Sequence, residues 1–321
     1  MSNCSSHRLS VDRNLIPALV ILLTTVWITA QVSKPASTSL RPITVITEPH
    51  SIIWIDDVRY GETDENGRLT IASLSPGIRS LRVRANGFAE VTKSLPATTR
   101  GDVTIALTKT SDEAELAYQS AETASTIDRQ KAIAEYQHAI KLRPKFPAAY
   151  LGMARMYSET GDIEKAFQAV RSAKRLRPAY AEASAVEGRL LKDTDDEEKA
   201  IAAFKRSISE GKGFQPEAYT GLGLLNKDRA ENFGGTGDFA NETASYNEAA
   251  KYLSVAAKQL GTSPDAMVVI QLLGLVYERQ KKFNEAIALY EEFLRLFPDS
   301  NEATAVQSFI VQIRKQMAQQ K

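Results

Sequence analysis

A pattern of small and large residues recurs in the second half of this chain at an interval of 34 positions. The stretch "AIAEYQHAIKLRPKF" at 132–146 is followed, 34 positions later, by "AFQAVRSAKRLRPAY" at 166–180. A period of this length marks one supersecondary unit that cannot bury its apolar face alone, so it predicts a stack of two-helix hairpins. The residues that keep the interval are Ala132, Ala166 and Ala200, together with Pro144 and Pro178.

The second helix of each predicted hairpin follows one template of residue sizes. A small residue comes first, a large residue follows one turn later, and a further packing residue stands three positions on. Small residues let two helix backbones approach closely, and the large residue fills the space beside them. A proline often ends the helix, because proline lacks the N–H that the next turn needs. The five instances are Ala132/Tyr136/Ala139, Ala166/Val170/Ala173, Ala200/Phe204/Ser207, Ala249/Leu253/Ala256 and Ala286/Tyr290/Phe293.

This arrangement resembles the tetratricopeptide repeat (TPR) over residues 111–299, with about five helical hairpins. The resemblance implies an all-α solenoid with a concave groove, lined by the first helix of each hairpin, that binds partner proteins or peptides. Residues 301–317 have no partner helix of their own. We therefore expect them to form a C-terminal helix that caps the open end of the apolar core.

Two of the predicted hairpins are irregular. The first helix of the first hairpin, "SDEAELAYQSAETAS", is rich in alanine and lacks the usual large residues, so we expect it to pack against the preceding domain. The fourth hairpin carries 15 extra residues, "RAENFGGTGDFANET" at 229–243, between its two helices. We expect either a tolerated surface insertion or a partner-binding loop that presents Phe233 and Phe239.

The periodicity becomes that of strands over residues 43–109. Apolar residues alternate or run together over five to eight positions, and turn dipeptides such as Asn66-Gly67 and Pro76-Gly77 separate these segments. Turns at intervals of about ten residues are typical of a small all-β sandwich. The predicted fold class is therefore multidomain, with a small all-β sandwich followed by an all-α solenoid. The predicted strand segments are "ITVIT", "SIIWIDD", "GRLTIASL", "SLRVRAN", "AEVTKSL" and "DVTIALT".

The β region resembles two families. "TVITEP" followed by "IWIDDVRYGET" is similar to a PEGA domain, and "TDENGRLTIASLSPGIRSLRVRANGF" is similar to the carboxypeptidase regulatory-like domain. Neither family is catalytic by itself, and the resemblance implies a spacer or interaction module of envelope and extracellular proteins. We expect Trp54 to pack in the core, with a ligand platform as the alternative.

The N-terminal segment has the features of an export signal. Residues 15–30 contain no charge, and Arg8 and Arg13 precede them. We expect residues 1–32 to be a signal peptide or a signal anchor that meets the membrane through residues 15–32, and residues 33–42 to be a Ser/Pro-rich tether. An uncleaved anchor would hold the bulk of the chain outside the cytoplasm on the membrane, whereas a cleaved signal would give a secreted protein.

Composition excludes several classes of function. Cys4 is the single cysteine and there are three histidines, so neither an internal disulfide nor a Cys/His metal site can be assembled. The net charge of +1 gives no electrostatic argument for nucleic-acid binding. No motif of a hydrolase triad, zinc protease or phosphate-binding loop is present. We therefore expect no catalytic residues, no metal, no cofactor and no small-molecule substrate.

The groove carries the candidate binding residues. The repeat register places Arg155, Arg189, Lys192 and Lys227 on the inner face of successive first helices. Some TPR domains clamp the C-terminal carboxylate of a partner there with a Lys/Asn set. Leu151 and Arg155 occupy the first of these places, so that clamp is not expected here. A basic ladder suits an acidic segment. The alternative is a solvated face of mixed charge, because Glu182, Asp193 and Glu217 are interspersed.

These observations predict a non-enzymatic scaffold, membrane-tethered or exported, that binds a partner protein or peptide in the groove. A second hypothesis is an envelope-polymer or glycan-binding protein that uses the sandwich. Exposed aromatic side chains on one sandwich face would favour that second hypothesis, and the available ones are Trp54, Tyr60 and Phe88.

Overall fold

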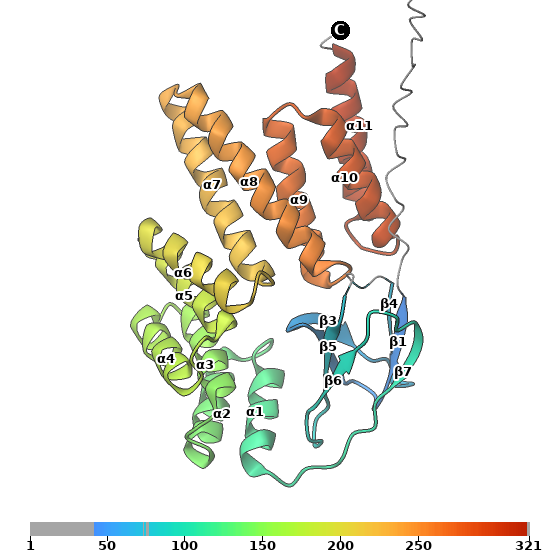
Figure 1. Ribbon diagram of the computed structural model, residues 1–321, viewed down its shortest axis with the longest axis vertical. Helices are drawn as coiled ribbons and strands as arrows, with labels where there is room; N and C mark the ends of the chain where they lie inside the picture. The colour runs from blue at the N-terminus through green and yellow to red at the C-terminus, as the bar shows by residue number, and fades with distance from the viewer. Residues whose placement is uncertain (1–41, 73, 75–76, 320–321) are drawn as a thin grey trace, which may run out of the picture. The chain divides into compact units, whose positions relative to one another are not determined.

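The computed structural model describes residues 42–319 apart from 73, 75 and 76, so the predicted signal segment and all but the last residue of the tether lie outside the described residues. Within the described part, seven strands precede eleven helices (Figure 1). The predicted fold class, a small all-β sandwich followed by an all-α solenoid, is confirmed. No helix in this part of the chain has both the length and the apolar character needed to cross a membrane.

The strands form two sheets. One has the order β4-β1-β7, with β1 antiparallel to β4 and parallel to β7, and the other has the order β3-β2-β5-β6, with all pairs antiparallel. Alternate side chains of each strand point to the space between the sheets, so Val45, Ile53, Leu81 and Val83 are all fully buried. The strand bounds are β1 Ile43–Ile46, β2 Ile52–Ile55, β3 Val58–Glu62, β4 Arg68–Ile71, β5 Arg79–Arg84, β6 Val91–Leu95 and β7 Gly101–Thr104.

The hairpin of β2 and β3 corrects the sequence prediction, which continued the strand "SIIWIDD" through Asp57 and included no strand at Val58–Glu62. Asp56 and Asp57 have φ angles of 48° and 66°, so a tight two-residue turn reverses the chain between Ile55 and Val58. Positive φ at both central residues is the geometry of a type I′ turn, which aspartate tolerates better than most residues. Asp56 holds the turn to β5, because its carboxylate accepts from the Ser80 N–H at 2.7 Å and pairs with Arg79 at 2.9 Å.

The helices pack in five consecutive hairpins, α1–α2 to α9–α10, and α11 covers the last one (Figure 1). The small and large residues of the sequence template are all almost completely buried. The helix bounds are α1 Glu113–Ala124, α2 Arg129–Leu142, α3 Pro147–Glu159, α4 Ile163–Leu176, α5 Ala181–Asp193, α6 Glu197–Glu210, α7 Pro216–Thr236, α8 Phe239–Leu260, α9 Pro264–Arg279, α10 Phe283–Leu296 and α11 Ala303–Gln319.

The extra residues 229–243 are helical, which corrects the expectation of a loop. Helix α7 continues through Thr236 and α8 begins at Phe239, so the turn between them contains only Gly237 and Asp238. Gly237 ends α7 in the left-handed conformation at φ 79°, and the Asp238 carboxylate accepts from the Asn241 N–H at the start of α8. The insertion therefore lengthens both helices of the hairpin instead of forming a surface loop.

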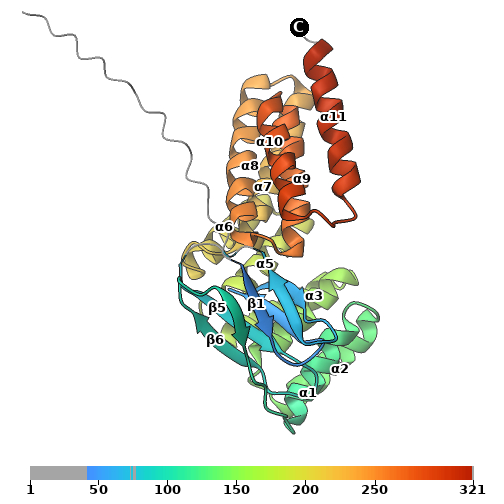
Figure 2. The same ribbon diagram turned by 90° about the vertical axis from the view of Figure 1, so that its right-hand side faces the viewer.

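The sandwich packs against the first hairpin, as the alanine-rich composition of α1 predicted. The Gln119 side chain of α1 accepts from the Gly87 N–H at 2.9 Å and donates to the Phe88 carbonyl at 2.8 Å. At the other side β3 contacts α9, and the buried apolar residues of the sandwich join those of α7–α11 in one cluster. Two perpendicular views both place the sandwich between α1 and the start of α9 (Figures 1 and 2).

Candidate functional site

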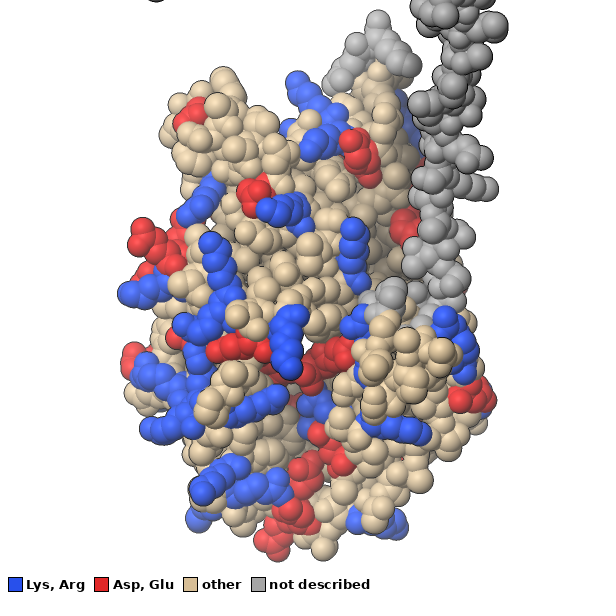
Figure 3. All heavy atoms as spheres, in the orientation of Figure 1, with Lys and Arg blue, Asp and Glu red and all other residues tan. Residues whose placement is uncertain are grey.

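A cavity of about 690 Å³ lies between the outer face of the β2–β3–β5 sheet and the first helices of the hairpins. The sandwich contributes the β2–β3 turn and β5, and α1, α3, α5, α7 and α9 supply the opposite wall. Basic and acidic side chains alternate where the sandwich meets the helices (Figure 3). The groove that the repeat pattern predicted is therefore shared with the protein's own β domain.

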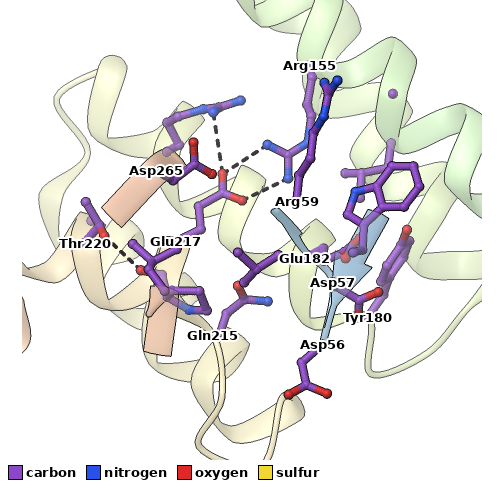
Figure 4. A pocket seen from close by; sticks show the side chains of 18 of the residues that line it. Asp56, Asp57, Arg59, Arg155, Tyr180, Glu182, Gln215, Glu217, Thr220 and Asp265 are labelled. Carbon is purple, nitrogen blue, oxygen red and sulfur yellow. Dashed lines mark hydrogen bonds and ion pairs between the residues drawn. The ribbon is translucent and has the colours of Figure 1, made fainter. Parts of the chain in front are cut away.

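Two of the predicted groove arginines converge on one carboxylate, and Figure 4 shows one of them, Arg155, beside Glu217. Arg155 of α3 donates to both Glu217 oxygens, at 2.9 and 3.3 Å, and Arg189 of α5 lies 3.5 Å from one of them. Glu217 stands in the first turn of α7. Burial alone would raise the pKa of Glu217, but the two guanidiniums outweigh it and hold the pKa below the ordinary value. This carboxylate therefore stays ionised and fills the place expected for an acidic ligand.

Two other carboxylates of the cavity have no such partner. Among the described residues, Glu182 of α5 and Asp265 of α9 make no hydrogen bond and no ion pair. Burial raises the pKa of Glu182, and the nearby negative charge of Asp57 adds to it against the opposing effect of Arg155. Asp265 is exposed, but partial loss of hydration beside the cavity and the negative charge of Glu217 likewise raise its pKa. The cavity thus holds acidic groups whose charge is incompletely compensated.

Aromatic and arginine side chains form the wall on the sandwich side. Trp54 alternates with Ile53 and Ile55 on β2, so it points away from the sandwich core and toward the helices. The guanidiniums of Arg82 and Arg84 lie 4.6 and 5.1 Å from the Trp54 ring. The Trp54 side chain is 8% exposed, so packing accounts for most of its surface while its remaining edge lines the cavity.

Arg84 connects the sandwich to the first helix. Its guanidinium stacks on Tyr118 of α1 at 4.5 Å and forms ion pairs with Glu90, Glu115 and Glu122. Only 6% of the Arg84 side chain is exposed. A buried guanidinium needs several carboxylates to offset its lost hydration, and here two of the three come from the helical part of the chain.

The other predicted binding residues have different settings. Lys192 lines the cavity, whereas Lys227 does not and pairs with Glu231 at 2.9 Å and with Asp228 at 3.6 Å. Phe233 is half-buried in the last turn of α7, and Phe239 is the first residue of α8 with 69% of its surface exposed. Arg155, Arg189 and Lys192 are therefore brought together, and Lys227, Phe233 and Phe239 lie outside the cavity.

The contribution of the sandwich to the groove was not predicted from the sequence. The Asp56–Asp57 turn, Arg59 and Arg82 reach the groove from a part of the sequence that precedes all the helices they face. Helical periodicity carries no information on such a contact. Across the described residues, no group of three histidine, cysteine, aspartate or glutamate side chains is arranged to hold a metal ion.

Comparisons with known proteins bear on the helical part. Two family models described as tetratricopeptide repeat match residues 128–190 and 269–300. Among solved structures, yeast Tom70 is similar with a TM-score of 0.51 and 18% identity, over 65% of this chain and 41% of that one. The chain thus spans about two fifths of that Tom70 structure, and at this identity the likeness concerns the fold alone.

Two further solved structures are similar at lower TM-scores. A MamA protein has a TM-score of 0.40 and 19% identity, over 61% of this chain and 96% of that one. The TPR domain of Arabidopsis OM64 has a TM-score of 0.34 and 20% identity, over 36% of this chain and 96% of that one. No curated protein matches the sequence. The two family matches, on helices that stack as consecutive hairpins, show that this chain carries tetratricopeptide repeats.

Proposed function

We propose that the protein is a non-enzymatic scaffold that binds a partner protein or peptide in the cavity between its sandwich and its repeats. Proteins built from TPR repeats mediate protein–protein interaction. The observation that carries the proposal is the cavity itself, which lies against the first helices of the hairpins and retains charged groups without a partner in the described structure. The sandwich then forms one wall of the binding site as well as a spacer.

Filling the cavity tests this proposal. Ala148 is a small, half-buried residue of α3 that lines the cavity, so Ala148→Trp would occupy part of its volume. The matched control is Ala240→Trp, because Ala240 is exposed at the start of α8. We expect cross-linking in cells of origin to capture partners with the wild type and with Ala240→Trp, and to lose them with Ala148→Trp at an unchanged melting temperature. Equal capture by both variants would place the partner elsewhere.

The tethering of this scaffold is a further part of the proposal. The uncharged segment 15–30 behind Arg8 and Arg13 supports an anchor or signal that leaves the repeats outside the cytoplasm. A reporter fused after Lys321 should be active only outside the cytoplasm, and a reporter active only inside it would contradict this topology. The PEGA-like or carboxypeptidase regulatory-like identity of the sandwich would fit such a location.

The glycan-binding hypothesis gains no support from the sandwich surface. It requires aromatic rings that are open to solvent on one face. Trp54 and Tyr60 are each 8% exposed and Phe88 is half-buried. These rings are used for packing within the chain.

A further inference from the structure

The charged groups of the cavity do not balance one another locally. Every arginine that lines the cavity already forms an ion pair within the described residues. The pairs are Arg155 and Arg189 with Glu217, Arg82 with Asp57, Arg84 with three glutamates, and Arg59 with Glu62. Within the described residues, Lys192 is the one lining cation that makes no ion pair. Against it stand three lining carboxylates that make none, those of Glu182, Asp193 and Asp265. The charge left for a ligand to meet is therefore negative.

Glu182 is the most informative of these groups. It lies in the first turn of α5, inside the cavity, where the labelled Glu182 and Asp57 face the same space (Figure 4). A carboxylate that has lost much of its hydration and gains no hydrogen-bond donor is costly for the fold. The nearby charges of Arg155 and Arg82 offset only part of that cost, because the pKa of Glu182 is still raised. A carboxylate in such a site is suited to accept hydrogen bonds from a cationic group of a bound partner molecule.

The same geometry argues against an acidic ligand. The guanidiniums of Arg155 and Arg189 already hold Glu217, so an acidic segment would have to displace that side chain. It would also approach the unneutralised carboxylates of Glu182 and Asp265. Like charges at this range in a partly desolvated site repel strongly. The sequence predicted an acidic partner on a basic ladder. The structure instead favours a partner of positive charge.

We propose that the cavity binds a basic peptide segment, whose lysine or arginine side chains pair with Glu182 and Asp265. This inference rests on the proposed scaffold function and names its partner class. Trp54 and Tyr180 border the same space and offer apolar surface to the methylene groups of such side chains. Glu217 is already paired with Arg155 and Arg189, so Glu182 and Asp265 are the carboxylates that remain for the peptide.

Peptide binding to the full chain tests the proposal directly. The probes are three fluorescent hexapeptides of equal length: one with two lysines, one with two glutamates in their place, and one of glycine and serine only. We expect the lysine peptide to bind most tightly, and its affinity to fall with added salt. Glu182→Gln should weaken it about tenfold, because a charged hydrogen bond is lost without a change of shape. Asp265→Asn should weaken it less, since Asp265 is exposed.

The controls separate binding from folding. Glu164→Gln removes a carboxylate on α4 that is 76% exposed and should leave lysine-peptide binding unchanged. Glu182→Gln should melt no lower than the wild type, because it removes a half-buried charge that Arg155 and Arg82 offset only in part. A structural glutamate would show the reverse, with lost stability and unaltered peptide affinity, and that result would overturn the proposal.

The remaining outcomes are also decisive. Tighter binding of the glutamate peptide, or binding of none of the three, overturns the inference about the partner's charge. The scaffold function is judged separately, by whether Ala148→Trp abolishes the capture of partners from cells. If that capture is lost in Ala148→Trp and kept in Glu182→Gln, the site binds a partner of another chemistry.

Discussion

Single glycines record how closely the helices approach one another. A Cβ built on Gly152 of α3 would lie 2.4 Å from the Cζ atom of Tyr136 on α2, and one on Gly274 would lie 2.3 Å from the Tyr290 hydroxyl. Hydrogen is therefore the only substituent that the large residue of the template leaves room for. The sequence pattern marked the large residue and its small neighbours on the second helix, and the glycines on the first helices complete the same contact.

We expect Gly152→Ala to lower the free energy of unfolding by about 1–3 kcal/mol, the usual cost of overpacking a core. The Tyr136 ring has little freedom to move, because its hydroxyl donates to Glu122 and its side chain is 1% exposed. The control is Gly235→Ala, since a Cβ on that helical glycine meets nothing within 4 Å. It should raise stability by about 0.5–1 kcal/mol through helix propensity. Urea unfolding measures both, and equal stabilities would mean that the helices separate freely at Gly152.

Two glutamates of the cavity should respond to pH in opposite ways. The folded pKa of Glu182 is raised above its ordinary value of 4.5, so its charge penalises the fold above that raised pKa and not below 4.5. Glu182→Gln should therefore raise the melting temperature at neutral pH, with a gain that fades as the pH falls to about 4.5. The folded pKa of Glu217 is lowered, so its stabilisation is present above 4.5 and is lost as the pH falls through the folded pKa.

Glu217→Gln should accordingly lower the melting temperature at neutral pH, and this loss should shrink in acid. Melting curves of the two variants and the wild type from about pH 3 to pH 8 measure both differences. A lowered melting temperature for Glu182→Gln at pH 7 would show that Glu182 has a stabilising partner within the chain.

At the level of elements, the helical hairpins were predicted from the sequence. The elements that were missed are those where turn-forming residues stand inside a helix or strand pattern. The 34-residue period placed the hairpins, because packing repeats whenever the same sizes recur. The α7–α8 extension was missed because Gly234 and Gly235 are ordinary marks of a loop. In the structure they lie within α7. The added turns of the two helices pack together, with Ala230 of α7 and Tyr246 of α8 buried. Gly237 and Asp238 alone carry the turn.

The β2–β3 hairpin is the opposite case, in which a turn was missed because the local residues continue the strand pattern. An Asp-Asp pair is a weak turn signal compared with Asn-Gly, and the residues around it continue the strand pattern. What selects the turn is tertiary: Asp56 accepts from β5 and pairs with Arg79, and Asp57 pairs with Arg82 at 3.2 Å. Those partners are more than twenty residues away and cannot be read from the local pattern.

For the molecule as a whole, the contact of the sandwich with the repeats decides what the groove can bind. The repeat register correctly brought Arg155 and Arg189 together. It could not show that the sandwich closes the space beside them, since that depends on long-range contacts, among them the ion pairs of Arg84 and the hydrogen bonds of Gln119. Arg84 forms ion pairs with Glu115 and Glu122 across this contact, and it lines the cavity. A substitution of Arg84 therefore tests whether the sandwich and the repeats unfold as one unit.

We expect Arg84→Gln to cost about 3–5 kcal/mol, because it leaves the partly buried Glu122 without a cation and Glu115 with Arg143 alone. The loss should also separate the unfolding of the sandwich from that of the repeats, giving two transitions by calorimetry where the wild type gives one. The control is Arg129→Gln, which breaks an ion pair with Glu159 whose side chains are 57% and 42% exposed and should cost less than about 1 kcal/mol. If Arg84→Gln unfolds in one transition at the wild-type temperature, the apolar cluster shared by the sandwich and α7–α11 holds the two parts together without it, and the wall of the cavity does not depend on this arginine.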